Sequence, residues 1–149
     1  MTDTLQAILL ATLVCGSLDA VAAATQAATL GMPAQRVFQG VASGVLGLRS
    51  FEKGWPSAIL GLALHFVIAC IISTVYVLAS LHLPFLLSRP LISRGIYGIA
   101  VFAVMFFIVL PLSRRPKRPF NLKFAITQLL IHIFIIGWSI ALSARYILR

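Results

Sequence analysis

WPSAILGLALHFVIACIISTVYVLASLH, residues 55–82, is the stretch of the sequence that decides the fold. Pro56 suits the first turn of a helix, and the residues after it stay apolar for about the 20 residues that a helix needs to cross a bilayer. The stretch therefore predicts a membrane-spanning helix, with the span itself at 57–80.

This span is expected to have two unlike faces. At helical spacing one face is small and polar, with Gly61, His65, Ala69, Ser73, Tyr76 and Ser80, and the opposite face is apolar, with Leu60, Leu64, Val67, Ile71 and Leu78. In lipid, small residues let helix backbones approach each other, and polar groups need partners away from the hydrocarbon. His65 and Tyr76 are therefore predicted to point into a helix bundle.

Three more apolar runs on either side of this stretch are long enough to span, at about 5–30, 95–112 and 124–144. The segment at about 33–48 is too short and too polar to cross, and its apolar residues recur at helical spacing. It predicts an interfacial or re-entrant amphipathic helix, with an ordinary connecting helix as the alternative. The chain is thus expected to be all-α, a single domain over 1–149, built as a four-helix transmembrane bundle with this additional helix after the first span.

Composition agrees with a multi-pass membrane protein, because 60% of the 149 residues are apolar and only 10% are charged. The formal net charge is +9, and the basic residues responsible for it lie outside the predicted spans. Basic residues at such positions are the ordinary topology signal of membrane proteins, so nucleic-acid binding is not expected. The two cysteines, Cys15 and Cys70, sit in apolar runs without metal-site spacing. The sequence also contains no Gly-x-Ser-x-Gly, P-loop or dinucleotide motif, and an enzyme is not expected.

Depth in the membrane brings several polar residues to one level. His65 and His132 each lie about 8 residues into parallel spans, and a rise of about 1.5 Å per residue places both about 12 Å from the same boundary. Asp19 and Met105, on the two antiparallel spans, come close to the same level. We therefore predict a buried polar cluster of Asp19, His65, His132, Gln128 and Tyr76, with His65, His132 and Met105 as possible ligands.

Three functions fit such a cluster. In the first, the polar residues hold the bundle together and the protein is a structural or interaction subunit. In the second, Asp19 and the two histidines translocate protons, ions or a substrate. In the third, His65 and His132 ligate a b-type haem inside the bundle, or they bind a copper ion together with Met105. The sequence contains no motif specific for either cofactor, and none is expected. A homo-oligomer or a membrane partner protein is compatible with each of these functions.

One set of motifs carries a resemblance across nearly the whole chain. The motifs are Gly16-x-x-Asp19, Arg36-x-x-Gln39-x-x-Ala42-Ser43-Gly44, Gly61-x-x-x-His65-Phe66, Tyr76, Pro84, Arg89-Pro90, Tyr97-Gly98, Met105 and Pro111-Leu112-Ser113. This pattern resembles a family of small four-helix bacterial inner-membrane proteins that has no established activity. The resemblance implies a bacterial inner-membrane location and supplies no catalytic residues.

Orientation follows from the basic residues between the spans. Eight lie on one side, namely Arg36, Arg49, Lys53, Arg114, Arg115, Lys117, Arg118 and Lys123, and four on the other, namely Arg89, Arg94, Arg145 and Arg149. The positive-inside rule puts the first group in the cytoplasm and both termini in the periplasm. Arg114, Arg115, Lys117 and Arg118 form a basic loop, for which contact with anionic lipid headgroups is the alternative to a topology signal.

Overall fold

The computed structural model describes residues 2–117 and 119–149, which form helices and short connections without any strand. The α-helices of ten residues or more are α1 (Thr2–Thr29), α2 (Ala34–Leu46), α3 (Trp55–His82), α5 (Pro90–Val104), α7 (Leu122–Ile131) and α8 (Trp138–Leu148). The shorter elements are the 3₁₀ turn η1 (Gly47–Phe51), α4 (Phe85–Ser88), the π-helical segments η2 (Met105–Val109) and η3 (His132–Gly137), and α6 (Leu110–Leu112).

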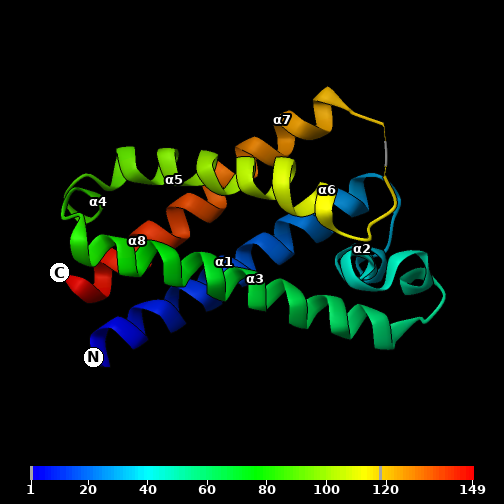
Figure 1. Ribbon diagram of the computed structural model, residues 1–149, viewed down its shortest axis with the longest axis horizontal. Helices are drawn as coiled ribbons and strands as arrows, with labels where there is room; N and C mark the ends of the chain where they lie inside the picture. Colours follow the sequence, from blue (N-terminus) through cyan, green and yellow to red (C-terminus); the bar gives the residue numbers. More distant parts are fainter. Residues whose placement is uncertain (1, 118) are drawn as a thin grey trace.

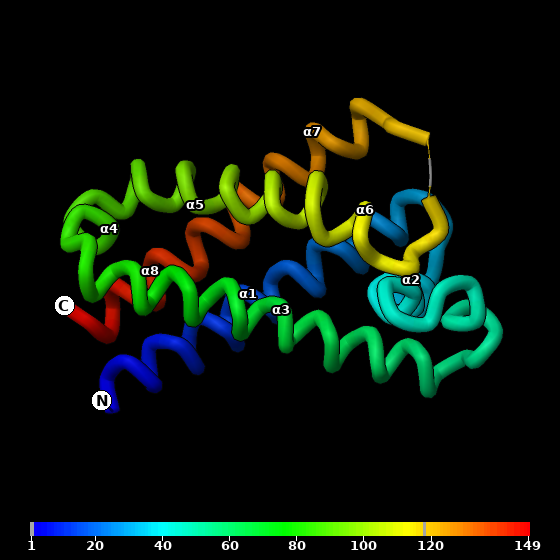
Figure 2. The backbone as a smooth tube through the Cα atoms, viewed as in Figure 1, coloured from blue at the N-terminus to red at the C-terminus, as the bar shows by residue number. Residues whose placement is uncertain are grey.

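Four helical stretches are long and apolar enough to cross a membrane: Thr2–Thr29, Trp55–His82, Pro90–Leu112 and Leu122–Leu148. The third joins α5, η2 and α6, and the fourth joins α7, η3 and α8, so that each runs on through a π-helical segment. Figure 2 shows the four stretches running back and forth along the molecule. The prediction of an all-helical chain with four candidate spans is confirmed.

The third of these stretches begins earlier than predicted, at Pro90 rather than near Gly95. Pro90 occupies the first helical turn, where the missing N–H costs nothing. Arg94, expected in a polar connection, lies inside the helix, and its guanidinium carbon is 3.7 Å from the centre of the Trp138 ring. This cation–π contact gives the charge a partner within the helix pair, which lets the helix extend.

Both termini lie at the same end of the molecule as α4, while α2 and the loop after α6 lie at the other end (Figure 1). In that view the spans run lengthwise and α2 is seen nearly end-on, so α2 crosses the end of the bundle. The predicted amphipathic helix after the first span is therefore present as α2, continued by the 3₁₀ turn. Its position relative to a membrane stays a prediction.

The predicted faces of α3 are confirmed by burial. Gly61, Ala69, Ser73, Tyr76 and Ser80 are buried and His65 is half-buried, whereas Leu60, Val67, Ile71 and Leu78 are exposed. Leu64 is the exception, because it is half-buried and lines an internal cavity. Leu64 therefore lies at the boundary between the inward and the outward face of α3.

The amphipathic helix α2 packs by its small and polar side. A Cβ atom at Gly61 of α3 would overlap the Phe38 carbonyl of α2, so the missing side chain lets the two backbones touch. Gln39 is 2% exposed there, and its Nε2 donates to the Gly54 carbonyl at 3.0 Å. The apolar side of α2, from Val37 to Val45, lines the internal cavity instead.

Packing is unequal along the bundle. The buried apolar cluster lies toward the termini, where α1, α3, α5 and α8 meet, and includes Ala7, Ala11, Val77, Ile140 and Ala144. Small residues from α1 and α8 dominate it, which allows close helix contact. The internal cavity occupies the other half, under α2, so the molecule is solid toward its termini and hollow toward α2.

Candidate functional site

The internal cavity has a volume of about 950 Å³ and lies between α1, α2, α3, α5–η2 and α7–η3. It is open at the α2 end of the molecule, where Leu30, Val45 and Leu48 on its wall are more than half exposed. Most of its wall is apolar. The polar and charged side chains on the wall are those of Asp19, Gln26, Arg36, His65, Ser113, Arg115, Gln128 and His132. Its volume and its few converging polar groups are typical of a pocket for a small molecule.

Asp19 of α1 and His65 of α3 face each other on this wall. His65 Nδ1 lies 4.0 Å from Asp19 Oδ2, and the two side chains are 14% and 25% exposed. His65 Nε2 lies 2.9 Å from the Gly16 carbonyl oxygen, which only accepts, so Nε2 carries a hydrogen and donates it. Nδ1, the nitrogen directed at Asp19, is therefore the one that carries no hydrogen in the neutral ring.

The helix geometry of α1 explains this alignment. Gly16 and Asp19 are three residues apart and share one face of α1, so the same imidazole meets the Gly16 carbonyl and the Asp19 carboxylate. Gly16 also admits the Phe66 ring, whose nearest carbon would lie 2.6 Å from a Cβ atom at that position. Phe66 and Phe38 pack edge-on against the His65 ring and fix its orientation.

His132 reaches the cavity from the other side. Its Nδ1 donates to the Gln128 carbonyl one turn earlier, at 2.7 Å, so Nε2 is its free, titratable nitrogen. The Phe102 ring packs edge-on against it, with ring centres 5.6 Å apart. His132 and Asp19 both line the cavity, and His65 is the histidine that faces the carboxylate directly.

A second polar contact joins α1 to α7 across the cavity. Gln128 Nε2 donates to Gln26 Oε1 at 3.0 Å. Gln26 lies seven residues after Asp19, two helical turns along the same face of α1. The Asp19–His65 pair and the Gln26–Gln128 pair are therefore two polar contacts on the cavity wall, about 10 Å apart along α1.

Both π-helical segments contribute to the cavity wall, η2 through Met105 and Phe106 and η3 through His132 and Ile136. A Cβ atom at Gly98 would overlap the His132 carbonyl, so α5 and η3 are in direct backbone contact beside the site. Widened π turns within α-helices occur frequently at functional sites. They give the two walls of the cavity a backbone geometry that helical periodicity does not predict.

The structure brings most of the predicted site residues to one place. Asp19, His65, Gln128, His132 and Met105 all line the cavity. Tyr76 does not line it, which corrects its predicted membership of the cluster. The tyrosine lies three turns beyond His65, toward the solid half of the bundle, and its Oη is 3.0 Å from the Leu86 carbonyl oxygen and 3.1 Å from Ser93 Oγ. These two contacts attach α3 to α4 and to α5.

The basic loop is only partly a surface feature. Arg114 and Lys117 are exposed, as a lipid-headgroup site requires, whereas Arg115 is half-buried and lines the cavity. The Arg114 amide donates to the Gly44 carbonyl of α2 at 2.9 Å, which attaches the loop to that helix. Arg118 lies outside the described residues.

Sequence reasoning did not assign Gln26, Arg36 or Phe102 to the site. The signal for Gln26 was present, because it shares a helical face with Asp19. Arg36 lines the cavity because α2 crosses the bundle end, and nothing in a single sequence predicts which way a short amphipathic helix turns. Phe102 sits in a uniformly apolar span, where periodicity does not separate the lipid face from the cavity face.

The fold and the cavity define a class: an all-helical protein with four helices long and apolar enough to cross a membrane, and a mainly apolar cavity with a few polar side chains on its wall. Comparison with protein families, with curated proteins and with solved structures gives no match. The resemblance to small bacterial inner-membrane proteins is therefore still a prediction, and the site alone indicates a function.

Proposed function

We propose that the protein is a small proton-conducting carrier that holds its substrate in the cavity, conducts protons also without it, and uses Asp19 and His65 as the proton-accepting pair. The observation that carries the proposal is the position of His65 Nδ1, 4.0 Å from Asp19 Oδ2 on a cavity of about 950 Å³. A carboxylate and a histidine deep in a membrane helix bundle typically mark a proton or substrate path.

The chemistry of the pair supports this role. With Nε2 committed to the Gly16 carbonyl, a proton arriving from the cavity binds either Nδ1 of His65 or Oδ2 of Asp19. Both atoms are close enough for each charge to affect the other, so the pair takes up and releases protons as one unit. His132, which presents Nε2 to the same cavity, supplies a second proton position on the opposite wall.

The bilayer setting completes the proposal. We infer a bacterial inner-membrane location with both termini in the periplasm, from the resemblance and from the excess of basic residues on the α2 side. In this orientation the hollow half of the bundle faces the cytoplasm, α2 lies at that interface, and the exposed Arg114 and Lys117 contact anionic lipid headgroups.

Proton flux in proteoliposomes tests the proposal. The purified protein is reconstituted in a bacterial lipid extract with a pH indicator inside, and a potassium diffusion potential drives proton entry. We expect acidification with the native protein, and its loss in Asp19→Asn and His65→Gln. Asp3→Asn and His82→Gln are the matched controls, because both residues are exposed near the ends of their helices.

A native protein that conducts no protons, although Asp19→Asn lowers its thermal stability, would assign the pair to bundle packing as a structural subunit. Haem b or copper at His65, His132 and Met105 stays a prediction of the sequence. His132 has the arrangement of a typical metal-binding histidine, because its Nδ1 donates to a backbone carbonyl and leaves Nε2 free. An absorption spectrum and metal analysis of the freshly purified protein test this alternative.

A further inference from the structure

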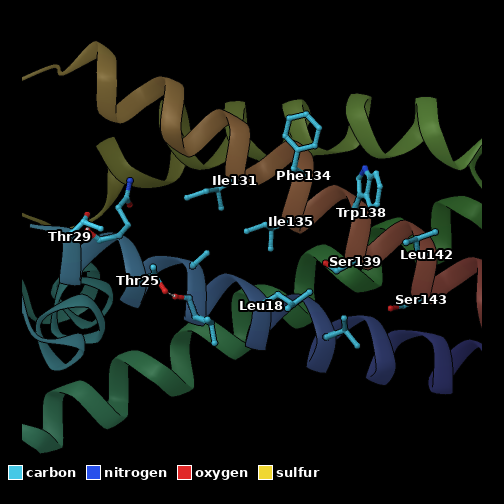
Figure 3. Close-up of a pocket in the computed structure, with 14 residues that line it drawn as sticks. Leu18, Thr25, Thr29, Ile131, Phe134, Ile135, Trp138, Ser139, Leu142 and Ser143 are labelled. Atoms are coloured by element: carbon cyan, nitrogen blue, oxygen red, sulfur yellow. Dashed lines mark hydrogen bonds between the residues drawn. The ribbon is translucent and has the colours of Figure 1, made fainter.

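A second hollow lies on the outside of the bundle, between α1 and the α7–α8 pair. It is a groove of about 720 Å³ (Figure 3). Leu18 and Thr25 belong to the α1 wall, and Ile131 and Ile135 point from the other wall into the space between them (Figure 3).

The groove faces the side on which a membrane-spanning bundle meets lipid. Five of its lining residues are large, apolar and exposed, and the three most exposed are Leu18 at 49%, Val21 at 64% and Phe134 at 58%. All three lie within helical stretches long and apolar enough to span. A hydrocarbon chain from the bilayer therefore reaches this groove without entering water.

The groove and the internal cavity share two wall residues, Gln26 and Ile131. Gln26 accepts the hydrogen bond from Gln128, which lines the cavity, so this amide pair forms the seam between the two spaces. A single neutral hydrogen bond between membrane helices is weak, because either amide finds another partner when the helices separate. The seam is therefore a place where α1 and α7 separate at low cost.

We propose that the cavity is loaded sideways from the bilayer, through the groove and past the Gln26–Gln128 seam, and that its substrate is a single-chain amphiphile with an anionic head group. Fatty acids and lysophospholipids with an anionic head share this chemistry. The inference rests on the proposed function, since it names the substrate class of the same cavity.

The charges on the cavity wall favour an anionic head. Arg36 and Arg115 both line the cavity near α2. Asp19 lies ten residues before the end of α1, a rise of about 15 Å, so its carboxylate is well separated from the α2 end along the helix. An anionic head near the two arginines leaves the alkyl chain against the apolar part of the cavity wall, which includes Phe38, Phe102 and Phe106.

Photo-crosslinking of the full chain tests this route. A palmitic acid analogue with a diazirine in its chain is added to phosphatidylcholine liposomes that contain the protein, and cross-linked peptides are mapped by mass spectrometry. We expect labels on the groove helices and on the cavity-lining segment around Phe102 and Phe106. Leu18→Trp fills the groove and should lower labelling of the cavity segment about tenfold, which corresponds to roughly 1.4 kcal/mol.

Leu13→Trp is the matched control, because Leu13 is also an exposed leucine of α1 but does not line the groove. It should leave cavity labelling unchanged. Competition with unlabelled compounds identifies the head group. Oleic acid and lysophosphatidylglycerol should compete, whereas lysophosphatidylcholine should compete poorly, and the stronger of the two anionic competitors distinguishes a fatty acid from a lysolipid.

Cavity labelling that Leu18→Trp and Leu13→Trp leave equally strong would overturn the lateral route. Equal competition by lysophosphatidylcholine would overturn the anionic head. Labelling requires no proton movement, so its outcome is independent of the flux measurement. Groove-dependent labelling without proton flux would refute the carrier and keep the lipid-derived ligand, and proton flux without cavity labelling would do the reverse.

Discussion

At the scale of single residues, we expect the stability of the protein to depend on Asp19 of α1 and His65 of α3 together. Each is more than half buried, and the removal of one leaves its partner without the opposite charge or acceptor that it faces. We expect Asp19→Asn and His65→Ala each to lower the free energy of unfolding by about 1–2 kcal/mol. The double variant should lose less than the sum, with a coupling of at least about 0.5 kcal/mol.

Unfolding by a denaturing detergent, followed by circular dichroism, measures this cycle. Asp3→Asn is the control for the loss of a carboxylate at an exposed position. Strict additivity of the two losses would show that the residues act separately, and it would remove the basis for treating them as one proton-accepting pair.

Arg94 and Trp138 form the second residue-level contact with a measurable signal. The guanidinium carbon lies 3.7 Å from the ring centre, a distance at which a cation–π contact contributes about 0.5–2 kcal/mol. In a Trp55→Phe background, where Trp138 is the only tryptophan, Arg94→Gln should shift the emission spectrum and lower the melting temperature. Arg89→Gln, at an exposed position before α5, should do neither.

At the scale of elements, the contact of α2 with α3 depends on the absence of a side chain at Gly61. A Cβ atom there would overlap the Phe38 carbonyl and lie 3.1 Å from the Ala42 nitrogen, both part of the α2 backbone. Gly61→Ala should therefore destabilise the protein by about 1–3 kcal/mol. Gly95→Ala is the matched change, because a Cβ atom at that helical glycine meets nothing within 4 Å, and it should be neutral or stabilising. Equal melting temperatures of the two variants would contradict this packing.

The same elements show what the sequence predicts and what it does not. The inward face of α3 followed from helical spacing, since lipid and protein impose opposite demands on the two sides of a span. The direction of α2 did not follow, because its buried side carries Gln39 and Ser43, whose partners come from distant parts of the chain or their own backbone. Asp19, His65 and His132, which were predicted to lie at one depth, all line the cavity, whereas Tyr76 lies three turns farther along α3 and does not.

At the scale of the whole molecule, the division into a solid and a hollow half follows from side-chain size. Toward the termini, alanines of α1 and α8 allow the helices to pack without a gap. Toward α2, polar side chains and the two π-helical segments occur on the facing walls, and the cavity lies between them. In the proposed carrier, the closely packed half is the fixed point about which the helices of the other half move.

The orientation of the whole bundle provides the last prediction. Eight basic residues lie on the α2 side and four on the side of the termini, so the native protein should insert with both termini in the periplasm of a bacterial host. A carboxyl-terminal fusion to a phosphatase that is active only in the periplasm should be active, and a fusion to a fluorescent protein that folds only in the cytoplasm should be dark. Replacing Arg114, Arg115, Lys117 and Arg118 with Gln reduces the count to four on each side and should give both signals from a mixed population. A bright fluorescent fusion of the native chain would reverse the orientation and place the hollow half toward the periplasm.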